Sequence, residues 1–129
     1  IADNIKHTIE SIASSFQKVI IIYPIPEMGW DIPRKLNKHV QLKDSIDAAT
    51  GSITIDEYKE RNEIIMKTLD SLGEDDKFVR IMPDKYFCSD FDNGRCFAHI
   101  DMKYLYNDDD HLSNFGAQFI SNDIFNYLE

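Results

Sequence analysis

An aspartate and a histidine near the C-terminus have the residue types and the spacing of a proton-relay pair. Asp108 stands three residues before His111 in the segment 106–113, YNDDDHLS. An imidazole can take the proton of a serine hydroxyl, while a neighbouring carboxylate fixes the ring's tautomer and stabilises the imidazolium. We therefore identify Asp108 and His111 as candidate catalytic residues of a hydrolytic or acyl-transfer site.

The same segment allows two other interpretations. An acidic run beside a histidine is often a solvated loop, and the carboxylates of residues 108–110 could also bind a hard cation. Even in solvent, Asp109 and Asp110 would favour the protonated form of His111 through their negative charge. A second acidic stretch, 90–94, lacks the glycine position and the closing glutamate of a calcium loop, so we discount it.

The candidate pair lies in a loop that enters a predicted helix. Ser113 is the expected N-cap of a helix over about 114–127. Two β-branched runs, 19–23 and 78–82, predict strands. Because the first run has no polar alternation, we expect both of its faces to be buried, as in a parallel sheet. Ligands of such sheets bind at the carboxyl ends of the strands, where this loop would present its side chains.

Three further helices are predicted from periodicity and capping signals. Residues 4–16 carry an apolar stripe that includes Ile12 and Phe16. Thr54 with Glu57 forms a capping box that opens a helix to about residue 72. A short helix is expected within 34–48, and a long loop over 84–107.

The alternation of helices and buried strands predicts an α/β fold with a parallel sheet. Two strands alone do not make an independently stable sheet. We therefore expect that part of the domain precedes Ile1, or that the fragment self-associates to cover its strand edge.

Composition excludes some classes of function. The formal net charge is −9 with no basic run, which argues against nucleic-acid binding. No apolar stretch is long enough to span a membrane. Cys88 and Cys96 lack zinc-site spacing and could be a disulfide or two free thiols. No cofactor or metal motif is recognised.

For the other notable polar and aromatic residues we favour structural or surface positions over functional roles. Trp30 is expected at the core edge rather than in a sugar-binding cleft. Arg61 could pair with a carboxylate or lie on the surface. His7, His39 and His99 have no partner visible in the sequence and are expected to be surface or loop histidines.

Four segments together resemble the C-terminal part of an SGNH/GDSL-like hydrolase domain. The most specific is the block from Asp108 to Ala117, DxxHLSxxGA. Residues 24–27 (PIPE) after the first strand, 58–61 (YKER) in a helix, and the cysteine pair upstream of the block are similar to segments of one subgroup. That subgroup is fused to membrane acyltransferases of the acyltransferase-3 family, which O-acetylate surface polysaccharides.

The resemblance implies a three-layer α/β/α sandwich with a mainly parallel sheet, of which residues 1–129 form the C-terminal portion of a single domain. It implies that Asp108 and His111 belong to a Ser-His-Asp triad that needs no cofactor. The chain has no Gly-Asp-Ser, and none of its nine serines lies in such a context. We therefore expect this chain alone to be inactive as a serine-dependent acyltransferase or esterase.

The resemblance also implies an extracytoplasmic location, a transmembrane acyltransferase domain in the parent chain, and an acylated or acceptor glycan as partner. It favours a disulfide between Cys88 and Cys96. The alternative function is a non-catalytic module that binds glycan or docks on the membrane enzyme.

Overall fold

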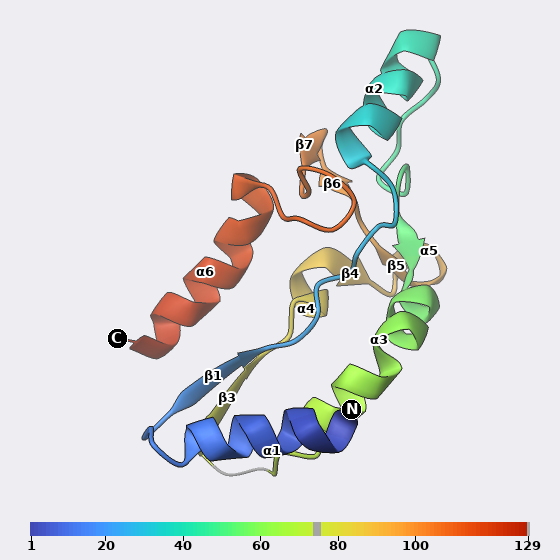
Figure 1. Cartoon of the computed structure of the whole chain (residues 1–129). Helices are drawn as coiled ribbons and strands as arrows, with labels where there is room; N and C mark the ends of the chain where they lie inside the picture. Colours follow the sequence, from blue (N-terminus) through green and yellow to red (C-terminus); the bar gives the residue numbers. More distant parts are fainter. Residues whose placement is uncertain (74–75, 129) are drawn as a thin grey trace.

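The computed structural model of the chain describes residues 1–73 and 76–128 (Figure 1). Two strands, β1 (Val19–Ile22) and β3 (Phe78–Ile81), form a parallel pair. Helices α1 (Ala2–Ala13) and α3 (Ile55–Asp70) pack together on one side of this pair, and α6 (Asn114–Leu128) contacts β3. The predicted α/β fold with a parallel sheet is confirmed.

Alternate side chains of β1 enter different parts of the core. Ile21 packs with Leu69 of α3 and with Leu72 just after it, whereas Ile20 packs against the cluster that contains Ile81 and Ile120. This alternation follows from the two-residue period of a strand. It places a helical layer on each face of the parallel pair.

The expectation that both faces of the first strand are buried is wrong at its end. Ile22 is 46% exposed. Its side chain lines an open apolar groove with a volume of about 410 Å³, together with Ile5, Ile9, Ile12, Val19, Ile20, Ile21, Pro24, Ile65 and Leu69. Within the described residues, β1 pairs with β3 alone.

The helices follow their local signals, with shifted ends. The capping box is present: Thr54 Oγ1 accepts from Glu57 N at 3.1 Å, and Glu57 Oε2 accepts from Thr54 N at 2.8 Å. The first helix ends at Ala13 rather than 16, and Phe16 is 59% exposed. The short helix predicted within 34–48 is α2 (Ile32–Leu42), whose N-cap Asp31 accepts from Arg34 N.

The predicted long loop over 84–107 is wrong, because it contains several short elements. Two-residue strands have no periodicity that a sequence can reveal, which explains the error. The elements are α4 (Asp84–Phe87), β4 (Cys88–Ser89), α5 (Phe91–Gly94), β5 (Arg95–Cys96), β6 (His99–Ile100) and β7 (Lys103–Tyr104). Strand β2 (Ile53–Thr54) joins β5 and β4 in an antiparallel sheet, and β6 pairs with β7.

The disulfide is confirmed. Cys88 and Cys96 face each other across the β4–β5 ladder and are bonded. The bridge closes the short segment that holds α5, and Cys96 is fully buried.

None of the helices in the described part of the chain is long and apolar enough to cross a membrane.

Candidate active site

Asp108 and His111 are brought into direct contact. His111 Nδ1 lies 2.9 Å from Asp108 Oδ2 and 3.1 Å from Oδ1, with hydrogen-bond geometry. The same carboxylate accepts from the backbone N–H of His111 at 2.7 Å and of Asp110 at 3.1 Å. The aspartate therefore fixes both the ring and the turn that carries it. A ring bonded through Nδ1 can offer Nε2 to a substrate or nucleophile.

A second carboxylate reaches the same ring nitrogen. Asp110 Oδ1 lies 2.8 Å from His111 Nδ1, so it forms an ion pair when the ring is protonated. The sequence left Asp110 in solvent, with at most a long-range effect on His111. Asp110 directly precedes His111, and whether neighbouring side chains meet depends on the fold of the loop.

These contacts set the charge states of the pair. Backbone hydrogen bonds from His111 and Asp110 lower the pKa of Asp108 to about 2. The hydrogen bond and charge of Asp108, with the charge of Asp110, raise the pKa of His111. At neutral pH the aspartate is thus an anion, and the imidazolium is favoured relative to a free histidine.

The loop between Tyr106 and Ser113 is closed by backbone bonds. Tyr106 and Leu112 form an isolated antiparallel bridge, and Asn107 N donates to His111 O at 2.8 Å. Ser113 N donates to Leu105 O at 2.9 Å. The loop is therefore a tight, internally bonded turn that holds the pair at its tip.

The start of α6 anchors the loop from the other side. Ser113 Oγ accepts from Gly116 N at 3.0 Å, as an N-cap should, and donates to Tyr104 O at 2.7 Å. A Cβ on Gly116 would lie 2.2 Å from Leu105 O, so only glycine permits this approach of the helix to the segment after β7. Both roles explain residues of the DxxHLSxxGA block that carry no chemistry themselves. The hydroxyl of Ser113 is engaged structurally and is not placed as a nucleophile.

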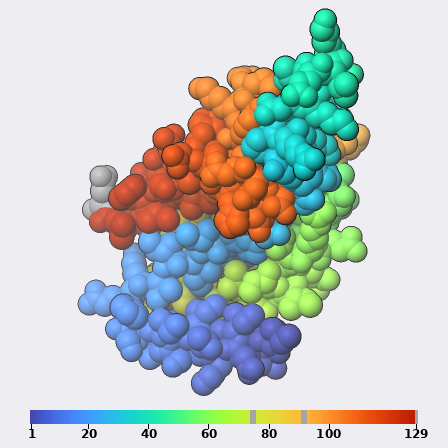
Figure 2. All heavy atoms as spheres, turned by 45° about the horizontal axis from the view of Figure 1, so that its top comes forward, coloured from blue at the N-terminus to red at the C-terminus, as the bar shows by residue number. Residues whose placement is uncertain are grey.

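The segment after β1 forms the floor of the site. Met28 N donates to Asp109 O at 3.0 Å, and Ile32 N donates to Asp108 O at 3.3 Å. In Figure 2 the orange loop lies against the blue and cyan surface of this segment, beside the red helix α6. The site thus joins parts of the chain that are far apart in sequence.

Three side chains hold the floor by its carbonyl groups. Tyr58 donates to Pro24 O at 2.8 Å, Tyr106 to Pro26 O at 2.7 Å, and Arg61 Nη1 to Glu27 O at 3.0 Å. Burial raises the pKa of Tyr58 and of Tyr106, so both phenols remain donors. The sequence suggested a carboxylate or solvent for Arg61; its partner is a backbone carbonyl instead.

The remaining predicted residues take different places. Trp30 is at the core edge as expected: its Nε1 donates to Gly51 O at 3.0 Å, and Lys35 Nζ lies 3.4 Å from the ring centre. The three other histidines differ in burial. His7 is exposed. His39 is half-buried, and its Nδ1 lies 3.6 Å from Asp44 Oδ2. The expectation for His99 is wrong, because it is 5% exposed. Residues 46–48 of the loop after α2 line the same pocket as His99, and no local pattern in the sequence connects the two.

One cluster in the described residues could hold a metal ion. Single ligand atoms of Asp108, Asp110 and His111 lie within 4.8 Å of one another. The same atoms already form the contacts between His111 and the two carboxylates, so a cation would compete with the charge of His111.

Comparison with known proteins identifies the family. A family model described as "SGNH domain (fused to AT3 domains)" matches residues 1–125. The chain belongs to this SGNH family. The SGNH chain also resembles a solved structure, the periplasmic domain of lipopolysaccharide acetyltransferase from Salmonella ser. Paratyphi A, with a TM-score of 0.68 and 20% identity. The match covers 98% of the SGNH chain and 48% of the solved one, so the chain spans about half the length of that domain. No curated protein matches it in sequence.

Proposed function

We propose that the chain supplies the aspartate and histidine of a Ser-His-Asp acyltransferase site. The observation that carries the proposal is the contact of His111 Nδ1 with Asp108 Oδ2 at 2.9 Å, on a loop closed by the family's DxxHLSxxGA block. His111 is 74% exposed at its side chain, so its ring can meet groups from outside this chain.

The chemistry follows from this geometry. His111 accepts the proton of a serine hydroxyl as its oxygen attacks the acyl carbon, and the former ester oxygen leaves with a proton from the imidazolium. A sugar hydroxyl or water then takes the acyl group from the serine by the reverse proton transfers. Asp108 stays ionised throughout, stabilising each imidazolium.

The serine lies outside these residues in this proposal. Residues 1–129 form the C-terminal portion of a single domain, and the preceding portion supplies the nucleophile and the strands beside β1. The open apolar groove along Val19–Ile22 supports this arrangement, because an edge strand with an apolar face favours further pairing. The acyl group is acetyl and the acceptor a surface glycan, by analogy with the lipopolysaccharide acetyltransferase. The domain is extracytoplasmic and tethered to a transmembrane acyltransferase domain, for which the confirmed disulfide is additional support.

Acetyl transfer by the parent protein tests the role of the pair. We expect His111→Ala to abolish transfer, and Asp108→Asn to reduce it by roughly 10⁴-fold if this aspartate acts as in other triads. His39→Ala, at a partly buried histidine outside the site, is the matched control and should retain transfer. The isolated 129-residue chain should show no serine-dependent turnover of an acetyl ester.

A non-catalytic glycan-binding or docking module is the alternative. Undiminished transfer by folded His111→Ala parent protein would support that alternative and refute the catalytic role. Serine-dependent turnover by the isolated chain would contradict an external nucleophile.

A further inference from the structure

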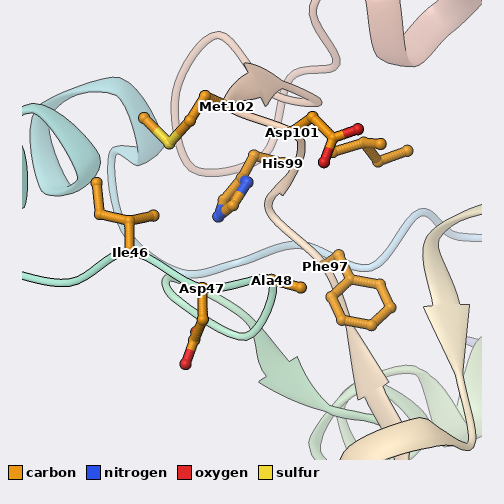
Figure 3. Close-up of a pocket in the computed structure, with 8 residues that line it drawn as sticks. Ile46, Asp47, Ala48, Phe97, His99, Asp101 and Met102 are labelled. Atoms are coloured by element: carbon orange, nitrogen blue, oxygen red, sulfur yellow. The ribbon is translucent and has the colours of Figure 1, made fainter.

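A pocket away from the loop that carries Asp108 and His111 contains a buried histidine. Its volume is about 420 Å³, and its lining includes Ile46, Asp47, Phe97, His99, Asp101 and Met102. Figure 3 shows the His99 ring pointing into the space between the loop of residues 46–48 and the β6–β7 turn. Pockets of this size can accommodate a small ligand.

His99 has the features of a binding group rather than a core residue. Its side chain is almost fully enclosed, and neither ring nitrogen bonds to any residue of 1–73 or 76–128. Buried polar atoms are nearly always paired, so an unpaired imidazole beside a pocket calls for a partner from outside the protein. Met102 lies beside the ring in Figure 3, and its flexible, partly exposed side chain can move aside to admit one.

The other lining groups define the ligand. The two ring nitrogens of His99 can each form a hydrogen bond, and a hydroxyl group can serve them as donor or acceptor. The carboxylate of Asp101 can accept from a hydroxyl and repels anions. Asp47 Oδ1 already accepts from Ala49 N and Thr50 Oγ1, so Asp47 adds mainly negative charge to the pocket. Phe97 and Ile46 provide apolar surface for a ring with C–H groups. These three requirements are met together by a neutral sugar.

A metal ion fits the pocket less well. Within the described residues, the sole group of three potential ligands gathered to 4.8 Å is the one at the catalytic loop. His99, Asp47 and Asp101 therefore do not form an ion-sized cage.

We propose that the His99 pocket binds one neutral sugar unit of a glycan. The inference concerns binding and needs neither a nucleophile nor the proton relay. It can therefore fail or hold independently of the proposed acyl transfer, while extending it with a subsite for the acceptor glycan.

Titration of the ¹⁵N-labelled SGNH domain of the parent protein with neutral methyl glycosides tests the proposal. Methyl glucoside, galactoside, mannoside and rhamnoside serve as probes, with glucuronate as the anionic comparison. We expect at least one probe to shift the His99 ring-nitrogen signals saturably, with a Kd in the millimolar range, and glucuronate to bind more weakly. Absence of a saturable shift for every glycoside at about 100 mM would overturn the proposal.

Two variants locate the ligand. His99→Phe keeps a ring but removes both nitrogens, and we expect affinity for the best glycoside to fall at least about tenfold. Asp101→Asn lies at an exposed turn with a φ of 47°, which asparagine tolerates, and should reduce the discrimination against glucuronate. Unchanged affinity in folded His99→Phe, or unchanged discrimination in Asp101→Asn, contradicts the proposed site.

Discussion

Tyr106 donates its buried hydroxyl to the carbonyl oxygen of Pro26, at 2.7 Å. This bond joins the residue two positions before Asp108 to the segment that forms the floor of the site. The backbone N–H groups of Met28 and Ile32 also donate hydrogen bonds to carbonyl oxygens of the loop that carries Asp108. The pair Asp108 and His111, although exposed, is thus held by a buried network.

Replacement of Tyr106 by phenylalanine tests this network. The variant removes the donor to a carbonyl beside a fully buried ring, so we expect a loss of about 1–3 kcal/mol in the free energy of unfolding. Urea denaturation measures it. Tyr104→Phe, which removes an exposed bond to Asn37 Oδ1, is the matched control and should cost less than about 0.5 kcal/mol. Equal losses in both variants would mean that the buried bond has no special importance.

Gly116→Ala should destabilise the domain, against the usual preference of helices. In an ordinary helix interior, alanine is favoured over glycine by about 1 kcal/mol. Here its Cβ would lie 2.2 Å from Leu105 O, and we expect a net loss of about 1–3 kcal/mol from overpacking. Thermal or urea unfolding gives the sign, with Gln118→Ala on the exposed face of α6 as a near-neutral control. A more stable Gly116→Ala would refute the close approach of α6 to Leu105.

The pKa of His111 should fall when either neighbouring carboxylate is neutralised. Asp108 provides both the hydrogen bond and the larger charge effect, so Asp108→Asn should lower this pKa more than Asp110→Asn. NMR titration of the imidazole measures both. If Asp109→Asn lowers the pKa as much as Asp110→Asn, the 2.8 Å contact of Asp110 does not persist in solution.

The raised pKa of His111 predicts how both the stability of the fold and acetyl transfer should change with pH. The pKa of His111 in the folded chain is raised above its ordinary value of 6.5, so its carboxylate contacts favour folding fully below that pH. This contribution disappears as the pH rises through the raised pKa. Conversely, the neutral His111 ring, which can accept a proton, is populated only above this raised pKa. Transfer by the parent protein should therefore begin at lower pH in Asp110→Asn than in wild type.

Removal of the disulfide should destabilise the chain. The bridge closes a loop of eight-residue separation, for which chain entropy predicts a contribution of about 2–3 kcal/mol. We expect the Cys88→Ser/Cys96→Ser double variant to lose this amount in urea denaturation, and wild type to lose a similar amount when reduced. The double variant should be insensitive to reductant. A reductant effect of equal size in the double variant would assign the loss to another cause.

Local signals were sufficient for much of the fold. The capping box at Thr54 and the N-cap at Ser113 depend on residues three positions away, and the structure has both. The parallel strands followed from β-branched runs. The pair Asp108 and His111 was visible for the same reason, since a carboxylate three residues from a histidine can bond it within one turn.

Features that depend on distant contacts were not visible. His99 is buried and shares a pocket with the loop after α2, whereas Ile22 at the end of β1 is exposed. The partner of Arg61 is a carbonyl 34 residues away in sequence. The floor of the site likewise has no sequence signal beyond the prolines that interrupt the strand.

The bond between Tyr106 and Pro26 also has a consequence for folding kinetics. It closes a loop of 80 residues, and contacts of such high sequence separation form slowly because chain entropy must be lost first. Helix α3 and the disulfide-closed turn need only local contacts and can form early. We therefore expect the environment of His111 to be among the last parts of the chain to mature during refolding.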